Sequence, residues 1–273
     1  MTMPSPASPY AGFKAENPEG YEGIMGRWSR RLAPLLIGLG GLADGERVLD
    51  VGCGTGSLTF ALPQAAKVAE VVGIDPSEAY VGFAAARNTD PRLSFRTGDA
   101  RALPFADAMF DRAYSMLVLQ FIPEYRQALD EMIRVTKPGG TITSAVWDSF
   151  SGLSAYRMLR DIAGVLDPTA RFPFASFSPL TGQGDIAAAW RAAGLQDVVA
   201  SDLMFRMDYA GFDDYWAPLE AGDGPPGQYI MSLTPDARAT LKDHVRRAYV
   251  SNRPDGVRSF VAVALGCRGT KPG

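Results

Sequence analysis

The chain has 273 residues, of which 47% are hydrophobic and 21% are charged, and its formal net charge at pH 7 is −3. This balance is ordinary for a folded protein and argues against a general binder of nucleic acid or of anionic membranes, which needs a basic surface. The two cysteines, Cys53 and Cys267, are too few for a disulfide framework and indicate a reducing compartment. The start MTMPSPASPY lacks a basic segment followed by an apolar run, and no apolar stretch is long enough to cross a bilayer. We therefore expect a soluble, cytoplasmic protein that has no membrane partner.

The chain begins with a proline-rich stretch. Residues 1–20 contain four prolines and few aliphatic side chains, which predicts a flexible N-terminal arm. From Tyr21 to Ile37 the apolar residues share one helical side, which predicts a helix that ends before the glycines 38, 40 and 41.

Strand and helix patterns then alternate. Predicted strands cover residues 47–51, 70–75, 93–97, 110–117, 141–147, 198–205 and 258–265. Predicted helices cover residues 57–68, 77–88, 124–135, 185–193 and 235–250. Within the first of these, Pro63 is expected to cause a kink or an early end. The alternation indicates an α/β fold, in which a doubly wound, mostly parallel sheet is covered by helices on both faces.

Two segments, roughly residues 148–180 and 207–233, interrupt this alternation after the fifth predicted strand. We predict that they are lid insertions in a single domain that spans residues 21–273. Residues 148–180 and 205–231 hold 11 aromatic residues in 60 positions, about 18%, against 10% for the chain. This enrichment favours either an apolar or aromatic substrate pocket or a small core inside the lids themselves.

The segment VLDVGCGTGS at residues 48–57 runs from a predicted strand through three alternating glycines, Gly52, Gly54 and Gly56. Glycine permits positive φ and lets a ligand approach the backbone closely. Exposed amides at a helix start add a polar cradle. Ligands of doubly wound sheets bind at the carboxyl ends of the strands, near the point where strand order reverses. The loop therefore predicts a ligand site, against the plainer interpretation of a turn that needs glycine.

Acidic residues follow the next two predicted strands. Asp75 ends the second strand, where a carboxylate can bind both hydroxyls of a ribose. Asp99, in Gly98-Asp99-Ala100, follows the third strand, where it can accept from an adenine amine. A single aspartate at a strand end is often only a cap or turn residue, but two of them beside a glycine loop favour a nucleoside site.

The glycine spacing distinguishes between nucleoside ligands. A dinucleotide fingerprint is G-x-G-x-x-G, whereas the third glycine here falls one position early and Ser57 stands at the expected site. Asp50 would repel a pyrophosphate and attract an ammonium group. A ligand with adenosine at one end and a zwitterionic amino acid at the other fits this pattern, and S-adenosylmethionine is such a ligand.

Over residues 21–147 the sequence resembles the class I S-adenosylmethionine-dependent methyltransferases, specifically the type 11 group that includes quinone-biosynthesis methyltransferases. The resemblance is carried by DVGCGTG at 50–56, GIDPS at 73–77, GDA at 98–100, LPF at 103–105, FD at 110–111 and RVTKPGG at 134–140.

The resemblance implies a Rossmann-like, seven-stranded sheet whose last strand is antiparallel. It also implies that the glycine loop holds the methionine part of the cofactor, that Asp75 holds the ribose, that Asp99 and Ala100 meet the adenine edge, and that two residues ending the fourth strand lie beside the methionyl part. The cofactor-binding residues predicted in this way are Asp50, Gly52, Cys53, Gly54, Thr55, Gly56, Asp75, Pro76, Gly98, Asp99, Ala100, Met116 and Leu117.

The first predicted helix can close over the same site. Tyr21, Met25 and Trp28 supply apolar surface, and Arg30 is a candidate partner for the cofactor carboxylate. Packing of this helix against the sheet explains its apolar residues equally well.

The sequence identifies no catalytic residue. Methyl transfer from a sulfonium is a direct displacement, so the protein mainly aligns the reacting groups and excludes water. The only histidine, His244, lies in the charged helix LKDHVRRAY, and we interpret it as a solvated surface residue. Some members of the family have a histidine where Gln120 stands, so acid/base catalysis from that position is in doubt.

Three other polar residues have structural explanations. Asp148 and Tyr156 follow the fifth predicted strand and can reach a substrate, although ordinary loop polarity explains them as well. Cys53 has no partner base that the sequence names, and we interpret it as a small packing residue.

The sequence thus predicts an S-adenosylmethionine-dependent methyltransferase for a small, apolar or aromatic molecule, acting as a monomer or homodimer without a metal. One alternative is a protein of the same fold that binds S-adenosylmethionine or S-adenosylhomocysteine without transferring methyl, as a sensor, a scaffold or a catalyst of another reaction. A nicotinamide-dependent oxidoreductase is disfavoured by Ser57 and Asp50. A methyltransferase for macromolecules also remains, but the nucleic-acid signature Asn/Asp-Pro-Pro-aromatic is replaced by Leu-Gln-Phe-Ile-Pro at 119–123.

Overall fold

The structure is a computed structural model that describes residues 17–169, 179–182, 184–221 and 224–273. Most of the predicted N-terminal arm therefore lies outside the described residues, as do Phe172, Phe174 and Phe177 of the first predicted lid.

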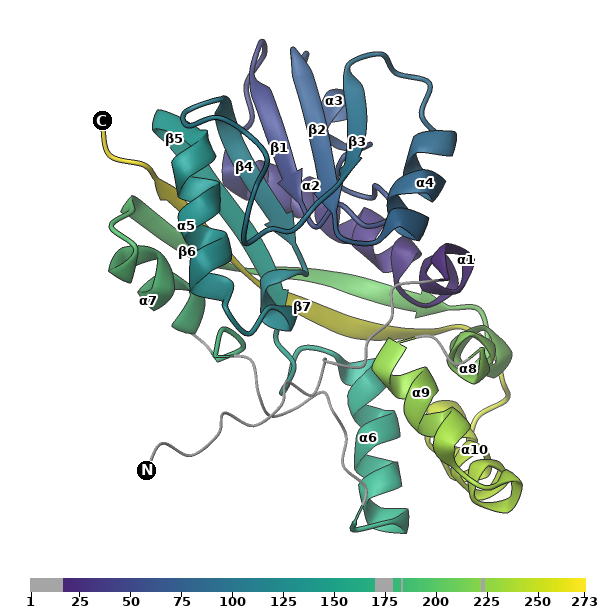
Figure 1. The fold of residues 1–273 in the computed structure, drawn as a ribbon. Coiled ribbons are helices and arrows are strands. Elements are labelled where there is room, and N and C mark those ends of the chain that lie inside the picture. Colours follow the sequence, from purple (N-terminus) through teal and green to yellow (C-terminus); the bar gives the residue numbers. More distant parts are fainter. Residues whose placement is uncertain (1–16, 170–178, 183, 222–223) are drawn as a thin grey trace, which may run out of the picture.

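A seven-stranded sheet with the order β3-β2-β1-β4-β5-β7-β6 forms the centre of the described chain (Figure 1). Its strands are β1 (Arg47–Val51), β2 (Glu70–Asp75), β3 (Leu93–Thr97), β4 (Phe110–Met116), β5 (Thr136–Trp147), β6 (Gln196–Tyr209) and β7 (Arg258–Thr270). The pairs among β1 to β5 are parallel, whereas β7 is antiparallel to both β5 and β6. This arrangement confirms the predicted fold class, including the antiparallel last strand.

The strand register aligns the ends that were expected to build the site. Val51 lies beside Ile74, and Asp75 lies beside Thr97, so β1, β2 and β3 end at one edge of the sheet. The chain leaves β1 toward β2 and β3 on one side and returns to β4 on the other, so strand order reverses between β1 and β4. Open α/β sheets place their ligands at such a point.

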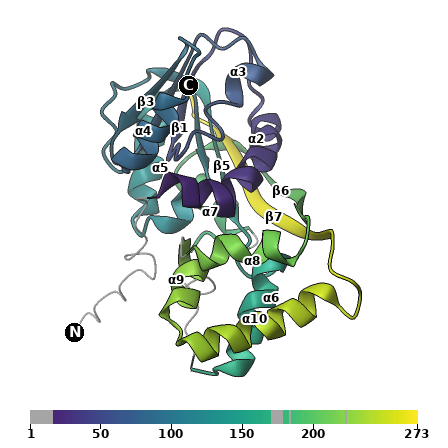
Figure 2. The same ribbon diagram turned by 90° about the vertical axis from the view of Figure 1, so that its right-hand side faces the viewer.

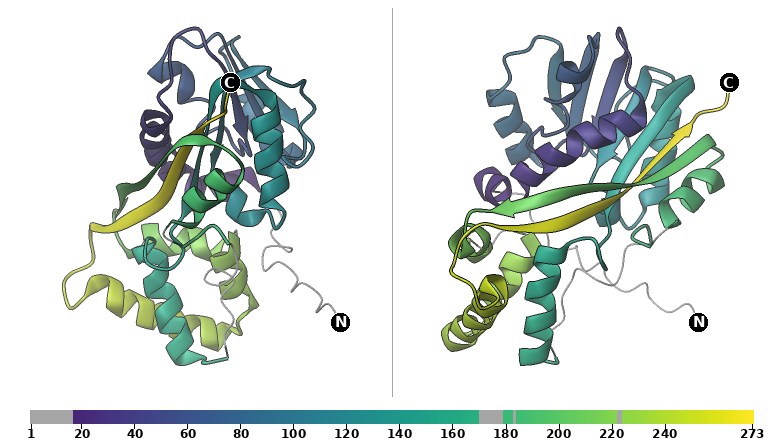
Figure 3. Two further views of the ribbon diagram at one scale, coloured as in Figure 1. Left: turned by 90° about the vertical axis from the view of Figure 1, so that its left-hand side faces the viewer. Right: turned by 180° about the vertical axis from the view of Figure 1, so that it is seen from behind.

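Helices cover both faces of the sheet. The first helical stretch consists of α1 (Pro18–Tyr21), the π-helical turn η1 (Glu22–Gly26) and α2 (Arg27–Gly40), and it crosses one face (Figure 3). The others are α3 (Leu62–Ala65), α4 (Glu78–Ala86), the 3₁₀ turn η2 (Leu119–Phe121), α5 (Tyr125–Val135), α6 (Ser154–Leu166), α7 (Asp185–Ala192), α8 (Phe212–Glu220), α9 (Gly224–Ser232) and α10 (Pro235–Val250).

The predicted boundaries of two helices are wrong. The helix expected at residues 57–68 is reduced to the four residues of α3, and residues 57–61 form turns instead. Pro63 lies in the first turn of α3, where its missing N–H costs nothing, so the helix begins there and is not kinked. The first helix continues through Gly38 and ends at Gly40, and the following Gly41 caps it with a left-handed φ of 69°.

The two predicted lid segments contain regular helices. The second begins later than expected, because β6 continues to Tyr209. Helices α6, α8, α9 and α10 gather at one end of the molecule, beyond the sheet, and we call them the helical cap (Figures 1 and 2). Within it α10 contacts α6 and α8, and α8 contacts α9.

The core has one part on each face of the sheet. On one side α2 and the helical cap pack around Trp28, Leu36 and Tyr215. On the other side α5 and α7 pack around Leu129, Met132 and Trp190. Trp190 is fully buried and its indole N–H donates to the carbonyl of Ile142 at 3.1 Å, which fixes α7 against β5. The site thus lies on a sheet held rigidly from both faces.

Candidate functional site

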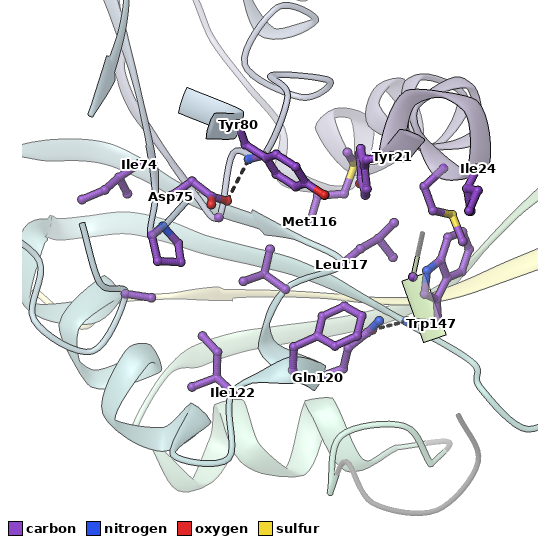
Figure 4. Close-up of a pocket in the computed structure, with 18 of the residues that line it drawn as sticks. Tyr21, Ile24, Ile74, Asp75, Tyr80, Met116, Leu117, Gln120, Ile122 and Trp147 are labelled. Carbon is purple, nitrogen blue, oxygen red and sulfur yellow. Dashed lines mark hydrogen bonds between the residues drawn. The ribbon is translucent and has the colours of Figure 1, made fainter. Parts of the chain in front are cut away.

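A cavity of about 440 Å³ opens at the carboxyl ends of β1, β2 and β4, between the sheet, η1 and the helical cap. Nine of the predicted binding residues line it: Gly52, Gly54, Asp75, Pro76, Gly98, Asp99, Ala100, Met116 and Leu117. The sequence therefore located one side of the cavity. Figure 4 shows how side chains from distant elements meet around it.

The three loop glycines all have positive φ, at 76°, 52° and 90°, but for different reasons. A Cβ on Gly52 would meet the side chain of Val118 at 2.3 Å, and one on Gly56 would meet Phe60 at 2.6 Å, so both glycines permit close packing. A Cβ on Gly54 would find its nearest neighbour, Tyr80, only at 3.9 Å. Gly54 is thus the position at which the bare backbone faces the cavity.

Asp75 holds the glycine loop in place. One carboxylate oxygen accepts from the amide of Gly54 at 2.9 Å, and the other accepts from the amide of Ser77 at 2.9 Å. The residue is only 8% exposed, and burial raises the pKa of its carboxyl despite these two hydrogen bonds. Because Asp75 also lines the cavity, it presents preorganised acceptor oxygens to a ligand.

Asp50 lies behind the loop, outside the set of residues that line the cavity. It is fully buried, and its Oδ2 accepts from the Thr59 hydroxyl at 2.6 Å. Its Oδ1 is buried without a hydrogen-bond partner among the described residues. Burial raises the pKa of this carboxyl to about 7. The sequence predicts that Asp50 attracts the ammonium group of the cofactor. Its position behind the loop does not favour such a direct contact.

Asp99 is engaged by a neighbour. Arg101 donates to both of its carboxylate oxygens, the shortest distance being 2.7 Å, and also donates to Glu124 at 3.0 Å. The hydrogen bonds from Arg101 lower the pKa of Asp99. Beside it, a Cβ on Gly98 would meet Ile74 at 2.6 Å, so the missing side chain keeps this wall of the cavity flat.

The end of β4 turns sharply into the cavity. Leu117 has a φ of 64°, a conformation that costs about 1–3 kcal/mol for such a residue, and its amide donates to Ala145 at 2.7 Å. This turn directs the following residues, Val118 and Gln120, to the cavity wall. Strain of this kind is common at functional sites.

The N-terminal helix closes one side of the cavity but does not use Arg30 there. Arg30 pairs with Glu22, and Glu22 also accepts from the hydroxyl of Thr55 at 2.5 Å and lies 4.0 Å from Arg87. The predicted residues Arg30 and Thr55 thus lie in a network centred on Glu22, while Cys53 and Gly56 lie in the loop away from the cavity lining.

Several cavity residues were not predicted as binding residues. Among them are Ile24 from η1, Tyr80 from α4, Gln120, Phe121 and Ile122 from the turn after β4, Trp147 from β5, Leu153 directly before α6, and Pro226 from α9. Tyr21, Met25 and Tyr156, which the sequence marked as able to reach the site, also line the cavity.

Half of the described lid aromatics pack on one another. Tyr209, Phe212, Tyr215 and Trp216 are buried, and they form a cluster with Tyr249 and Phe260 at ring distances of 5.3–6.3 Å. Phe150 is 70% exposed. Of the described members of the set, Tyr156 alone lines the cavity, so the enrichment mainly reflects the core of the helical cap.

Within the described residues, no group of three or more His, Cys, Asp and Glu is arranged to hold a metal ion. Burial raises the pKa of the Cys53 thiol, which fits its interpretation as a packing residue. His244 is exposed on α10, with its Nδ1 2.9 Å from the carbonyl of Thr240. A search of the described helices finds none with the length and apolar character of a membrane span.

Known proteins resemble this chain in sequence and in fold. Residues 49–144 match the model of a family described as a methyltransferase domain. An uncharacterized protein of Mycobacterium tuberculosis is 34% identical over 198 residues, which cover 70% of this chain and 71% of that protein. The demethylmenaquinone methyltransferase of Renibacterium salmoninarum is 41% identical over 117 residues, 43% of this chain and 48% of that enzyme. The [4+2]-cyclase SpnF shares the fold, with a TM-score of 0.58 and 22% identity over 89% of this chain and 82% of that one.

Proposed function

Because this chain belongs to the family of class I S-adenosylmethionine-dependent methyltransferases, we propose that it methylates a small, neutral, largely apolar molecule bound in the cavity. The observation that carries the proposal is the continuity of this cavity. One part is lined by the glycine loop and Asp75, and the other by the aromatic and aliphatic side chains of η1, β5 and α6.

The residues of the first part fit the cofactor. Gly54 leaves the backbone accessible, Asp75 offers acceptor oxygens for ribose hydroxyls, and Ala100 forms an apolar wall. Tyr80, whose ring lies 5.3 Å from that of Tyr21, adds an aromatic surface at the side of the loop. When bound, S-adenosylmethionine supplies an electrophilic methyl group and leaves as S-adenosylhomocysteine.

The second part favours a neutral acceptor molecule. The charged side chains among the described lining residues are Asp75, Asp99 and Arg101, and Arg101 is already bound to Asp99 and Glu124. No free cation of the described chain therefore faces this part to bind a phosphate or carboxylate. Tyr21, Trp147 and Tyr156 instead provide aromatic surface.

The chain's own contribution to the reaction is alignment and exclusion of water. The described lining residues include no histidine, lysine, glutamate or cysteine. The two carboxylates of the lining are already engaged, Asp75 by the amides of Gly54 and Ser77 and Asp99 by Arg101, so neither is set up as a general base for the acceptor. Burial raises the pKa of both Tyr21 and Tyr156, so these hydroxyls stay protonated at neutral pH. The acceptor atom is then expected to be a nucleophile on its own, and positioning supplies the rate enhancement.

Thermal unfolding with S-adenosylhomocysteine, and with NADH as the control, tests the cofactor. At about 100 times its dissociation constant a ligand stabilises by about 2.7 kcal/mol, which raises the melting temperature of a domain of this size by about 5–10 °C. We expect this rise with S-adenosylhomocysteine alone. A folded sample that responds to neither ligand would contradict the proposal.

Detection of S-adenosylhomocysteine after incubation with S-adenosylmethionine and candidate acceptors separates methyl transfer from cofactor binding alone. Binding without product across neutral aromatic acceptors would favour the alternative of a non-transferring binder. The cytoplasmic location and the monomeric or homodimeric state stay predictions.

A further inference from the structure

Gln120 is a buried polar residue in the acceptor part of the cavity. It lies in η2, directly after the strained turn at Leu117, and is 5% exposed. Three residues close to it in sequence, Val118, Phe121 and Ile122, also line the cavity and are apolar. The side-chain amide of Gln120 is therefore the polar group that this turn brings to an otherwise apolar wall (Figure 4).

A backbone contact fixes the orientation of this amide. The main-chain N–H of Trp147 donates to Gln120 Oε1 at 2.6 Å (Figure 4). A backbone N–H can only donate, so the oxygen of the amide must face Trp147 and the NH₂ group must point elsewhere. The amide is thereby held in one of its two flip states.

The NH₂ group has no hydrogen-bond partner among the described residues, although Gln120 is buried and lines the cavity. The NH₂ nitrogen is not one of the fully buried atoms that lack a partner, so it is open to the cavity, where an acceptor atom of a ligand can pair with it. The atom that satisfies an NH₂ donor is a hydrogen-bond acceptor, and in a neutral organic molecule this is most simply an oxygen.

We propose that Gln120 is a substrate-binding residue that donates a hydrogen bond to an oxygen of the methyl acceptor. This inference rests on the proposed function and narrows its substrate class to a neutral, apolar, ring-sized molecule that carries a carbonyl or phenolic oxygen. Because the cavity lacks a free cation among its described residues, the oxygen belongs to a neutral group, in contrast to a carboxylate or a phosphate.

The test compares two probes of nearly equal size, 1-tetralone and tetralin, which differ by one carbonyl oxygen. Their dissociation constants are measured by ligand-observed NMR titration on protein saturated with S-adenosylhomocysteine. The measured quantity is the ratio of the two constants. Comparing this ratio between protein variants cancels the different hydration of the free probes, as in a double-mutant cycle.

The main variant is Gln120→Met, which keeps the length of the side chain and removes the donor. We expect the preference for tetralone over tetralin to fall by about tenfold relative to the wild type, because tetralone loses a hydrogen bond while tetralin no longer buries an unsatisfied amide. Ser149→Ala is the matched control. It removes a different polar group, a hydroxyl, from the cavity wall, and it should leave the ratio unchanged.

Gln120→Met also loses the hydrogen bond from the Trp147 N–H, and this loss can destabilise the variant. A second variant therefore keeps an acceptor for that N–H. Gln120→Glu at about pH 9 keeps an acceptor for the Trp147 N–H and replaces the donor with an ionised carboxylate. It should also reduce the preference for tetralone. Melting temperatures of both variants establish that each remains folded.

Three results would overturn the inference: a ratio that changes by less than about twofold in both variants, an equal change in Ser149→Ala, or loaded wild-type protein that binds neither probe. Weaker binding of S-adenosylhomocysteine with an unchanged probe ratio would assign Gln120 to the cofactor instead. Failure of S-adenosylhomocysteine to bind the wild type would contradict the proposed function itself, which is a distinct outcome.

Discussion

At the scale of single residues, Gly54 is where the missing side chain matters most for a ligand. We expect Gly54→Val to lower the affinity for S-adenosylhomocysteine at least about 100-fold, because the new side chain would project into the cavity beside Tyr80. Isothermal titration calorimetry measures this loss.

Gly45→Val is the matched control for Gly54→Val. Gly45 has a similar positive φ of 79° and nothing within 4 Å of an added Cβ, so the substitution carries the same backbone strain away from the cavity. It should lower the melting temperature slightly and leave the affinity unchanged. Equal loss of affinity in both variants would show that strain, rather than occupation of the cavity, weakens binding.

Asp50 makes a prediction about pH. Its pKa is raised to about 7 by burial, above the ordinary value near 4, so the folded state keeps a proton that the unfolded state loses between these pH values. Its contribution to stability therefore falls as the pH rises through this window, and is constant above about pH 7. Asp50→Asn, which keeps an oxygen for Thr59 and does not titrate, removes this dependence.

We therefore compare the free energy of unfolding of Asp50→Asn with that of the wild type. From about pH 5 to about pH 8 the difference between them should shift by on the order of 2–4 kcal/mol in favour of the variant. Urea unfolding of both proteins at the two pH values measures it. The raised pKa of Asp75 contributes similarly to both proteins and cancels in the comparison. If the difference between variant and wild type is the same at both pH values, Asp50 does not hold its proton as proposed.

At the scale of elements, the π-helical turn η1 between α1 and α2 contacts the glycine loop. Glu22 lies at its start and binds Thr55 of the loop, Arg30 of α2 and, more distantly, Arg87. We expect Glu22→Ala to weaken S-adenosylhomocysteine binding about tenfold, because a partly buried charge-assisted contact that positions this wall is lost. Calorimetry gives the affinity.

Glu19→Ala serves as the control, since Glu19 is an exposed carboxylate in the same helical stretch. Hydrogen exchange of residues 18–26 should increase in Glu22→Ala and stay unchanged in Glu19→Ala. Unchanged affinity despite faster exchange would show that the helix covers the cavity without supporting the cofactor.

The elements also show where sequence patterns are informative. Helix α5 and strands β1 to β4 were located to within one residue, because each has a local pattern of its own, whereas β5 begins at Thr136 instead of residue 141. The segment at 57–61 was mistaken for helix, because three glycines and Pro63 impose turns that override the favourable composition. The extensions of β6 and β7 were also missed, since residues 206–209 pair with β7 and residues 266–270 pair with β5 and β6, which are partners from other parts of the chain.

At the scale of the whole molecule, the helical cap and the sheet share one core. The aromatic cluster around Tyr209 and Tyr215 is continuous with the buried residues of α2 and β5. We therefore expect a single cooperative urea transition, coincident by tryptophan fluorescence and by circular dichroism. Fluorescence reports on Trp28, Trp147, Trp190 and Trp216, which lie in the sheet, its covering helices and the cap. Transitions that do not coincide would show that part of the chain unfolds separately and would contradict a single domain over residues 21–273.

The sequence by itself determined the order and type of the main elements, the glycine loop and the acidic residues at the ends of β2 and β3, because these features depend on local periodicity and backbone conformation. Only the tertiary structure decided that Arg30 pairs with Glu22, that Asp50 lies behind the loop, and that Gln120 is oriented by Trp147. These contacts join residues that the fold brings together from separate elements. A contact of this kind depends on packing and burial, and it leaves no periodic pattern in the chain.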